Sequence, residues 1–94
     1  MDTQKEIKPE IIQDSETTEG IASRVILYND DWHSFDEVIA QLIKAINCPF
    51  EKARALTFEV HVKGKAVVYS GDLKECLRVS SVLEEIALHT QILT

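Results

Sequence analysis

The chain has 94 residues, enough for one small domain with a modest core. It is 45% hydrophobic and 28% charged, as is usual for a soluble globular protein. Its formal net charge of −6 argues against a nucleic-acid binder, which needs a basic surface to neutralise phosphates. No apolar run approaches the roughly 20 residues that span a bilayer, and no secretory signal pattern is present, so we expect a cytoplasmic protein without membrane contact.

Acidic residues concentrate at the N-terminus. Residues 1–20 hold six acidic residues against two lysines and contain no aromatic residue. Such a segment buries too little apolar surface to offset the conformational entropy that ordering would cost. We therefore predict a flexible acidic tail over residues 1–22 and a folded domain over residues 23–94.

The folded part is predicted to open with a strand and a helix. The run RVILY at residues 24–28 is rich in strand-forming residues and stops at the Asn-Asp-Asp of residues 29–31. Ser34 and Glu37 then stand three residues apart, which is the spacing of a capping box and predicts a helix start. Apolar residues recur behind them at helical spacing, and the helix is expected to end at Asn47.

The segment over residues 50–63 is ambiguous. Its first half consists of good helix formers, whereas apolar and polar residues alternate in its second half as they do in a strand. The composition favours a second helix, and the alternation favours a hairpin about Gly64. The residues by themselves leave both open.

Three further elements complete the predicted domain. Residues 65–69 are typical of a strand, Asp72 and Glu75 indicate a second capping box before a long helix, and residues 90–94 are typical of a closing strand. The side chains of this helix that we expect to face the core are Leu73, Cys76, Val79, Leu83, Ile86 and Ala87. The order β-α-(α)-β-α-β predicts an α+β fold with its helices on one face of a small antiparallel sheet.

Catalytic and cofactor motifs are absent from the sequence. No serine lies in a GxSxG turn, no histidine stands near either cysteine, and the three glycines do not form a phosphate-binding loop. We therefore expect no enzymatic activity, no cofactor and two reduced cysteines. Asp30, Asp31 and His33 are possible metal ligands, but an acidic loop before a helix explains them more simply, so no metal is expected.

Two stretches of the chain resemble a known family. The segments VILYNDDWHSFDEVIAQLI and ARALTFEVHVKGKAVV resemble the bacterial Clp protease adaptor family, ClpS, and the likeness covers about residues 25–93. The Asn-Asp-Asp of residues 29–31 and the Val-His pair of residues 60–61 with Gly-Lys-Ala at 64–66 stand at the family's spacing. The resemblance implies that the segment up to about His61 is helical. It implies a β-α-α-β-α-β domain, a three-stranded antiparallel sheet with three helices packed on one face.

The resemblance also implies a function. Family members bind the free N-terminus of N-degron proteins that begin with Leu, Phe, Tyr or Trp, and hand them to a AAA+ unfoldase paired with the Clp peptidase. Carried over by position, Asn29, Asp31 and His61 would hold the α-ammonium of the substrate, and Asp30 would orient the peptide backbone. The chemistry agrees, because an ammonium has three donors and these side chains offer an amide oxygen, a carboxylate and a neutral imidazole as acceptors.

The predicted hydrophobic pocket departs from the family pattern. The positions that the resemblance assigns to its lining are Leu27, Phe35, Val38, Thr57, Val60 and Leu93. Methionine is usual in the family where Phe35 and Thr57 stand. Because Phe is flat and stiff and Thr is short and polar, we expect a bulkier entrance and a shallower, more polar wall, with a neutral repacking as the alternative. His33-Ser34 replaces a common Thr-Pro, which is expected to shift the amino-binding corner.

The expected partners are N-degron proteins and the N-terminal domain of a Clp unfoldase of the ClpA or ClpC type. The resemblance places unfoldase docking on the third helix, at Arg78 and, if a short gap lies before it, at Asp72. The acidic tail would correspond to the extension that the unfoldase engages. The alternative is a domain of the same fold that docks on and modulates the unfoldase without binding a degron. A monomer is expected.

Overall fold

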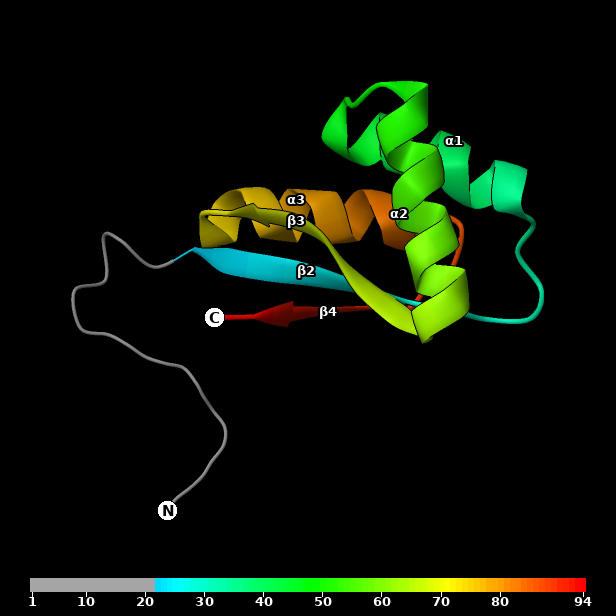
Figure 1. Cartoon of the computed structure of the whole chain (residues 1–94). Helices are drawn as coiled ribbons and strands as arrows, with labels where there is room; N and C mark the ends of the chain where they lie inside the picture. The colour runs from blue at the N-terminus through cyan, green and yellow to red at the C-terminus, as the bar shows by residue number, and fades with distance from the viewer. Residues whose placement is uncertain (1–21) are drawn as a thin grey trace, which may run out of the picture.

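The computed structural model describes residues 22–94, and a three-stranded antiparallel sheet runs through them (Figure 1). Strand β2, Ser23–Tyr28, lies at the centre, between β3, Lys65–Gly71, and β4, Thr90–Leu93. Both neighbours run antiparallel to β2, so the strand that leads into the acidic loop is held along both edges. The predicted tail lies, apart from Ala22, outside the described residues.

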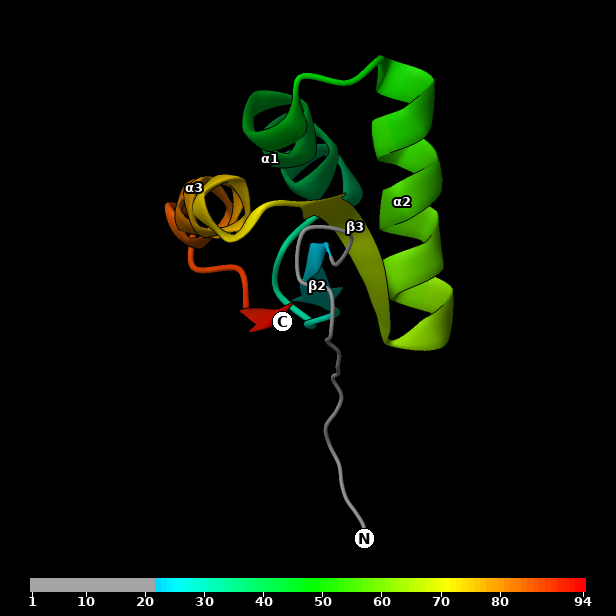
Figure 2. The same cartoon turned by 90° about the vertical axis from the view of Figure 1, so that its left-hand side faces the viewer.

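Three helices pack on one face of this sheet, as Figures 1 and 2 show. Helix α1 is Phe35–Ile46, α2 is Phe50–Lys63 and α3 is Leu73–Glu84. The element order is therefore β-α-α-β-α-β. This confirms the α+β fold class and the three-helix arrangement that the resemblance implied.

Helix α2 resolves the ambiguity between a helix and a hairpin. Its buried residues are Ala53, Thr57 and Val60, whose spacings of four and three place them on one helical face. Phe58 and Val62, which the alternation groups with Val60, are instead exposed at 58% and 61%. The alternation misleads because the buried face carries small side chains, while larger apolar side chains face solvent.

Helix α1 begins at the predicted capping box. The Ser34 hydroxyl accepts a hydrogen bond from the Glu37 N–H at 3.1 Å, and the Glu37 carboxylate accepts one from the Ser34 N–H at 2.7 Å. The helix ends before Asn47, whose φ of 53° lies in the left-handed region that Asn tolerates. The cap sets the point at which the acidic loop ends and Phe35 begins the helix.

Helix α3 begins with only half of its predicted capping box. The Asp72 carboxylate accepts a hydrogen bond from the Glu75 N–H at 2.8 Å. The Glu75 carboxylate, however, accepts a hydrogen bond from Arg78 Nε at 2.9 Å. This interaction with the following turn explains why Glu75 does not reach back to the cap.

Two residues predicted to face the core from this helix do not do so. Leu73 is 47% exposed, because it lies about a quarter turn from the centre of the face that buries Cys76, Val79 and Leu83. Ala87 is exposed because the helix has already ended when the chain reaches it.

The core is one cluster of apolar side chains between the helices and the sheet. Val25 and Leu27 of β2, Leu42 of α1 and Leu83 of α3 are fully buried in it. The alternate residues of β2 point to the other face of the sheet, where Arg24 is exposed. The inward face of β2 thus anchors the strand that ends at the acidic loop.

The turn after α3, residues 85–89, carries the two hydrogen bonds of a Schellman motif. The N–H of Ala87 donates to the Glu84 carbonyl at 2.9 Å, and the N–H of Leu88 donates to the Leu83 carbonyl at 3.4 Å. Ala87 has a φ of 65°, the conformation for which this motif normally uses glycine. Leu83 and Leu88 are both buried, as is usual for the apolar contact that accompanies the motif.

Replacing Ala87 by Gly is expected to raise the free energy of unfolding by about 0.5–1 kcal/mol, because Gly adopts the left-handed conformation without steric cost. Urea-induced unfolding measures the change. The matched control is Ala40→Gly, at an exposed position inside α1, which should lower the free energy of unfolding by about 1 kcal/mol. Destabilisation of similar size by both substitutions would contradict the assigned strain at Ala87.

Candidate functional site

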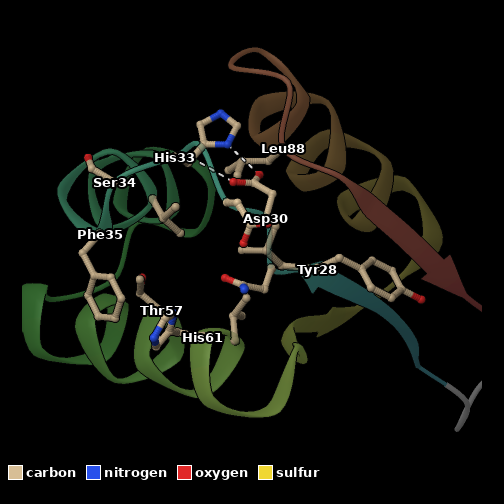
Figure 3. Close-up of a pocket in the computed structure, with 13 residues that line it drawn as sticks. Tyr28, Asp30, His33, Ser34, Phe35, Thr57, His61 and Leu88 are labelled. Atoms are coloured by element: carbon tan, nitrogen blue, oxygen red, sulfur yellow. Dashed lines mark hydrogen bonds and ion pairs between the residues drawn. The ribbon is translucent and has the colours of Figure 1, made fainter.

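A cavity of about 370 Å³ opens where β2 ends and α1 begins, beside α2 and the turn after α3 (Figure 3). The four residues that the resemblance assigned to the amino group and the peptide backbone all line this cavity: Asn29, Asp30, Asp31 and His61. Five of the six residues assigned to the hydrophobic pocket also line it: Leu27, Phe35, Val38, Thr57 and Val60. The fold therefore brings the two family motifs, which are distant in the sequence, to one cavity.

Leu93 does not line the cavity, contrary to the prediction. It pairs with Arg24 near the start of β2, whereas Thr90 pairs with Leu27 at the cavity end of the strand. Because a strand rises about 3.4 Å per residue, Leu93 lies about 10 Å further along β4 than Thr90. Leu88, in the turn before β4, lines the cavity instead.

Two backbone hydrogen bonds hold the end of β2 against its neighbours. The N–H of Asn29 donates to the Gly64 carbonyl at 2.9 Å, and the N–H of Tyr28 donates to the His89 carbonyl at 3.0 Å. Gly64 ends α2 with a φ of 87°, which only glycine adopts without strain. Since His61 lies one helical turn before Gly64, this contact brings Asn29 and His61 to neighbouring parts of the cavity mouth.

Asp30 organises the loop between β2 and α1. Its Oδ1 accepts hydrogen bonds from the backbone N–H groups of Trp32 at 3.1 Å and His33 at 2.9 Å, and its Oδ2 lies 2.6 Å from Nδ1 of His33. Burial is the largest influence on the carboxyl and raises its pKa, but the hydrogen bonds from His33 and Trp32 together outweigh it and leave the pKa below its usual range. Asp30 thus lines the cavity with both oxygens engaged by its own loop.

His33 belongs to the site, although the sequence prediction did not include it. It lines the cavity, and its side chain is 8% exposed. Its Nε2 donates a hydrogen bond to the Ile86 carbonyl at 2.5 Å, in the turn after α3. The hydrogen bond to Asp30, followed by the one to Ile86, raises the pKa of the imidazole above its ordinary value. Figure 3 shows His33 and Asp30 side by side, across the cavity from Thr57 and His61.

Phe35 and His61 meet at the edge of the cavity. Their ring centroids lie 5.4 Å apart with an interplanar angle of 72°, an edge-to-face contact that links α1 to α2. Figure 3 shows both rings on the same side of the cavity. Phe35 is 40% exposed, as suits a residue at an entrance.

Thr57 lines the cavity wall close to Phe35 and His61 (Figure 3). It is buried, and its hydroxyl donates a hydrogen bond to the Ala53 carbonyl of the same helix at 2.8 Å. The hydroxyl proton is therefore used inside α2. Thr57 adds less polarity to the wall than its sequence position suggested.

Tyr28 and Ser34 also line the cavity and were not predicted. Ser34 serves as the cap of α1. Tyr28 points away from the cavity in Figure 3, and its hydroxyl lies 2.6 Å from Oε1 of Gln91, to which it donates a hydrogen bond. Their side chains therefore support neighbouring elements rather than the wall.

The mouth of the cavity offers acceptors that are still free to bind a ligand. Asn29, Asp31 and His61 are exposed, and within residues 22–94 no hydrogen bond engages their side chains. An amide oxygen, a carboxylate and an imidazole thus stand beside a cavity walled by Leu27, Val38 and other apolar residues. This arrangement suits a ligand in which a small cationic donor group is attached to a hydrophobic side chain.

The two residues expected to dock an unfoldase have structural contacts of their own. Asp72 is the cap of α3. Arg78 donates a hydrogen bond from Nε to the Glu75 carboxylate at 2.9 Å and another from a terminal nitrogen to the Ala45 carbonyl at 3.0 Å. The second bond provides a donor for one of the carbonyls in the last turn of α1, which lack partners within the helix. Both residues are exposed, so these contacts leave part of each side chain accessible.

Among the described residues, no group of three or more His, Cys, Asp or Glu side chains is placed to hold a metal ion. Asp30 and His33, which the sequence analysis considered as metal ligands, form an ion pair with each other. Over residues 22–94, no helix combines the length and hydrophobicity needed to cross a membrane.

Comparison with known families matches residues 20–92 to the family described as ATP-dependent Clp protease adaptor protein ClpS. The chain is 49% identical to ClpS of Treponema denticola over 45 residues, which is 48% of this chain and 45% of that protein. It is 35% identical to ClpS of Oleidesulfovibrio alaskensis over 68 residues, which is 70% of this chain and 65% of that protein. It is also 32% identical to the E3 ubiquitin-protein ligase UBR1 of Drosophila melanogaster over 66 residues, 70% of this chain and 4% of the ligase.

A solved structure is similar to the fold described above. Agrobacterium tumefaciens ClpS2 bound to L-phenylalaninamide matches with a TM-score of 0.66 and 19% identity, over 76% of this chain and 93% of that one. At this level of identity the match shows a shared fold. By sequence, the chain spans less than two thirds of the length of each relative named above.

Proposed function

Because the chain belongs to the ClpS family of ATP-dependent Clp protease adaptor proteins, we propose that it is an N-degron receptor. It binds the free N-terminus of proteins that begin with a large hydrophobic residue, such as Leu, Phe, Tyr or Trp. It then delivers these proteins to a Clp AAA+ unfoldase for ATP-dependent proteolysis. An adaptor contributes binding, and the chemistry of cleavage belongs to the protease it serves.

The observation that carries this proposal is a group of side-chain hydrogen-bond acceptors at the mouth of an apolar cavity. Asn29, Asp31 and His61 accept one hydrogen bond each from the three N–H donors of an α-ammonium. Hydrogen bonds to a charged group are worth about 1.5–3 kcal/mol each, so the set discriminates a free N-terminus from an internal residue. Asp30 lies between Asn29 and Asp31 and holds the loop in shape, with less capacity left for the peptide backbone.

The first side chain of the substrate occupies the cavity. Its volume of about 370 Å³ lies near the lower end of the range for ligand pockets, about 300–1,000 Å³. Leu27, Val38 and Val60 supply apolar walls, and Phe35 stands at the entrance. The similar structure that holds L-phenylalaninamide supports this assignment, because that ligand combines a free amino group with a benzyl side chain.

Delivery requires a second surface. We assign it to the N-terminal domain of a ClpA-type or ClpC-type unfoldase, with Arg78 and Asp72 as contacts on α3. The acidic residues 1–22 are the segment that the unfoldase engages. In this role the protein acts as a monomer in the cytoplasm, where Clp substrates are degraded.

Fluorescence anisotropy with labelled peptides that differ only in the first residue tests the proposal. Peptides that begin with Phe or Leu are expected to bind at least about tenfold more tightly than those that begin with Ala or Arg. Ala leaves the apolar walls without contact, and burying a Phe or Leu side chain contributes about 1.5–3 kcal/mol. Arg would bury a charge in the cavity. Equal affinity across the series would contradict a pocket for the first side chain. No binding by any peptide would favour the alternative, a domain that docks on the unfoldase without a degron.

A further inference from the structure

We propose that His33 is a positioning residue for the peptide site, an inference that rests on the proposed function. Held as an imidazolium, His33 donates one hydrogen bond to Asp30 and one to the carbonyl of Ile86. It thereby ties the loop that carries Asn29 and Asp31 to the turn after α3. His33 acts through these contacts and needs no contact with the bound peptide.

The protonation state follows from the two partners of the ring. The Ile86 oxygen is a carbonyl, which can only accept, so Nε2 at 2.5 Å carries a proton. The Asp30 carboxyl already accepts two backbone N–H groups through Oδ1, and its Oδ2 lies 2.6 Å from Nδ1. An ionised carboxylate is also only an acceptor, so Nδ1 carries a proton as well. Since a neutral imidazole has one proton, only the imidazolium satisfies both partners.

The charges around His33 favour this form. Asp30 acts on it from the same loop, and Glu37 acts on it from the first turn of α1. From the turn after α3, the group that faces the ring is the neutral carbonyl of Ile86. Burial favours the neutral ring, but the hydrogen bonds and the two carboxylates outweigh it and raise the pKa of His33 above 6.5.

The two hydrogen bonds of His33 form a bridge from Asp30 to Ile86. This bridge matters for peptide binding because both of its ends belong to the site. At one end, Asp30 stands between Asn29 and Asp31, the two acceptors of the loop. At the other end, the turn that contains Ile86 also supplies Leu88 to the cavity wall. The bridge thus holds the polar mouth and one apolar wall in a constant relative position.

The bridge is expected to depend on pH. Loss of a proton leaves a ring lone pair facing either the carboxylate or the carbonyl, so one hydrogen bond becomes a repulsive contact. Because the pKa of His33 is raised in the folded protein, the bridge is complete below about pH 6.5 and is lost as pH rises through the folded pKa. The peptide affinity that depends on the bridge is expected to fall by about tenfold over that rise.

Two substitutions separate the pH dependence that arises from His33 from the pH dependence that arises from other groups. His33→Asn can still donate to Asp30, and His33→Gln can still reach the Ile86 carbonyl, so each keeps one hydrogen bond at every pH. Peptide affinities are measured by anisotropy with a Phe peptide at about pH 6, below the ordinary pKa of histidine, and at about pH 9, well above it. Titration of the peptide amino group is common to all three proteins and cancels from the ratio of dissociation constants.

The unaltered protein is expected to bind about tenfold more tightly than either variant near pH 6, and within about twofold of them near pH 9. A ratio that is the same at both pH values would overturn the proposal. Nitrogen-15 NMR of the full chain gives a second readout, because an imidazolium carries a proton on each ring nitrogen. A single proton on the His33 ring near pH 6 would also overturn it. An unaltered protein that binds no peptide at either pH would refute the proposed function itself, and the positioning role with it.

Discussion

Replacing Asp31 by Ala is expected to weaken the binding of a peptide with a free N-terminal Phe by about one to two orders of magnitude. The substitution removes a hydrogen bond to the ammonium together with the carboxylate that balances its charge. Asp30 cannot take over this role, because its carboxylate is already paired with His33. Asp31 is exposed, and no group within residues 22–94 bonds to its side chain, so the free energy of unfolding should change by less than about 0.5 kcal/mol.

Asp36→Ala is the matched control for this substitution. Asp36 is exposed in the first turn of α1, close to Asp31 in sequence, but it does not line the cavity. The Asp36→Ala substitution removes the same charge as Asp31→Ala. It should change peptide affinity by less than about twofold, through the loss of screened long-range attraction. Asp31→Asn keeps an acceptor and loses the charge, so its peptide affinity should lie between those of Asp31→Ala and Asp36→Ala. If both Ala variants lost affinity equally, binding would depend on the general acidity of the surface, and the role assigned to Asp31 would be wrong.

Local chemistry allowed the start of α1 and the loop before it to be predicted from the residues. The strand ends at Asn29 because Asn and Asp favour turns, and Ser34 with Glu37 specifies the helix start through two reciprocal hydrogen bonds. Both signals involve residues within three positions of each other. This is why the sequence locates the mouth of the site without reference to the rest of the fold.

Helix α2, and with it His61, could be placed only through the family resemblance. Its buried face consists of Ala53, Thr57 and Val60, while Phe58 and Val62 face solvent. A pattern of apolar residues therefore does not mark the buried side. The tertiary contacts with α1 and β3 determine which face is covered, and no local signal encodes them.

The contacts of Leu88 and His33 show where sequence reasoning ends. The Asp-x-x-His spacing of Asp30 and His33 is a local signal that could have indicated their pairing. The second partner of His33 is a backbone carbonyl in a turn 53 residues further along the chain. Glycine at position 87 would have indicated a turn, but the chain has Ala87 there. Neither the turn nor the position of Leu88 in the cavity was therefore predicted.

N-terminal acetylation of the peptide tests the central claim most directly. An acetylated Phe peptide brings one neutral N–H in place of three charged donors, so at least two hydrogen bonds from the ammonium to Asn29, Asp31 and His61 are lost. At about 1.5–3 kcal/mol each, their loss weakens binding by about two to four orders of magnitude. Because the chain carries a net charge of −6, the acetylated peptide should carry an additional C-terminal Lys, which keeps the net charge of the two peptides equal. Anisotropy of this charge-matched pair is expected to show tight binding of the free peptide and nearly none of the acetylated one. Equal binding of the two peptides would contradict recognition of a free N-terminus.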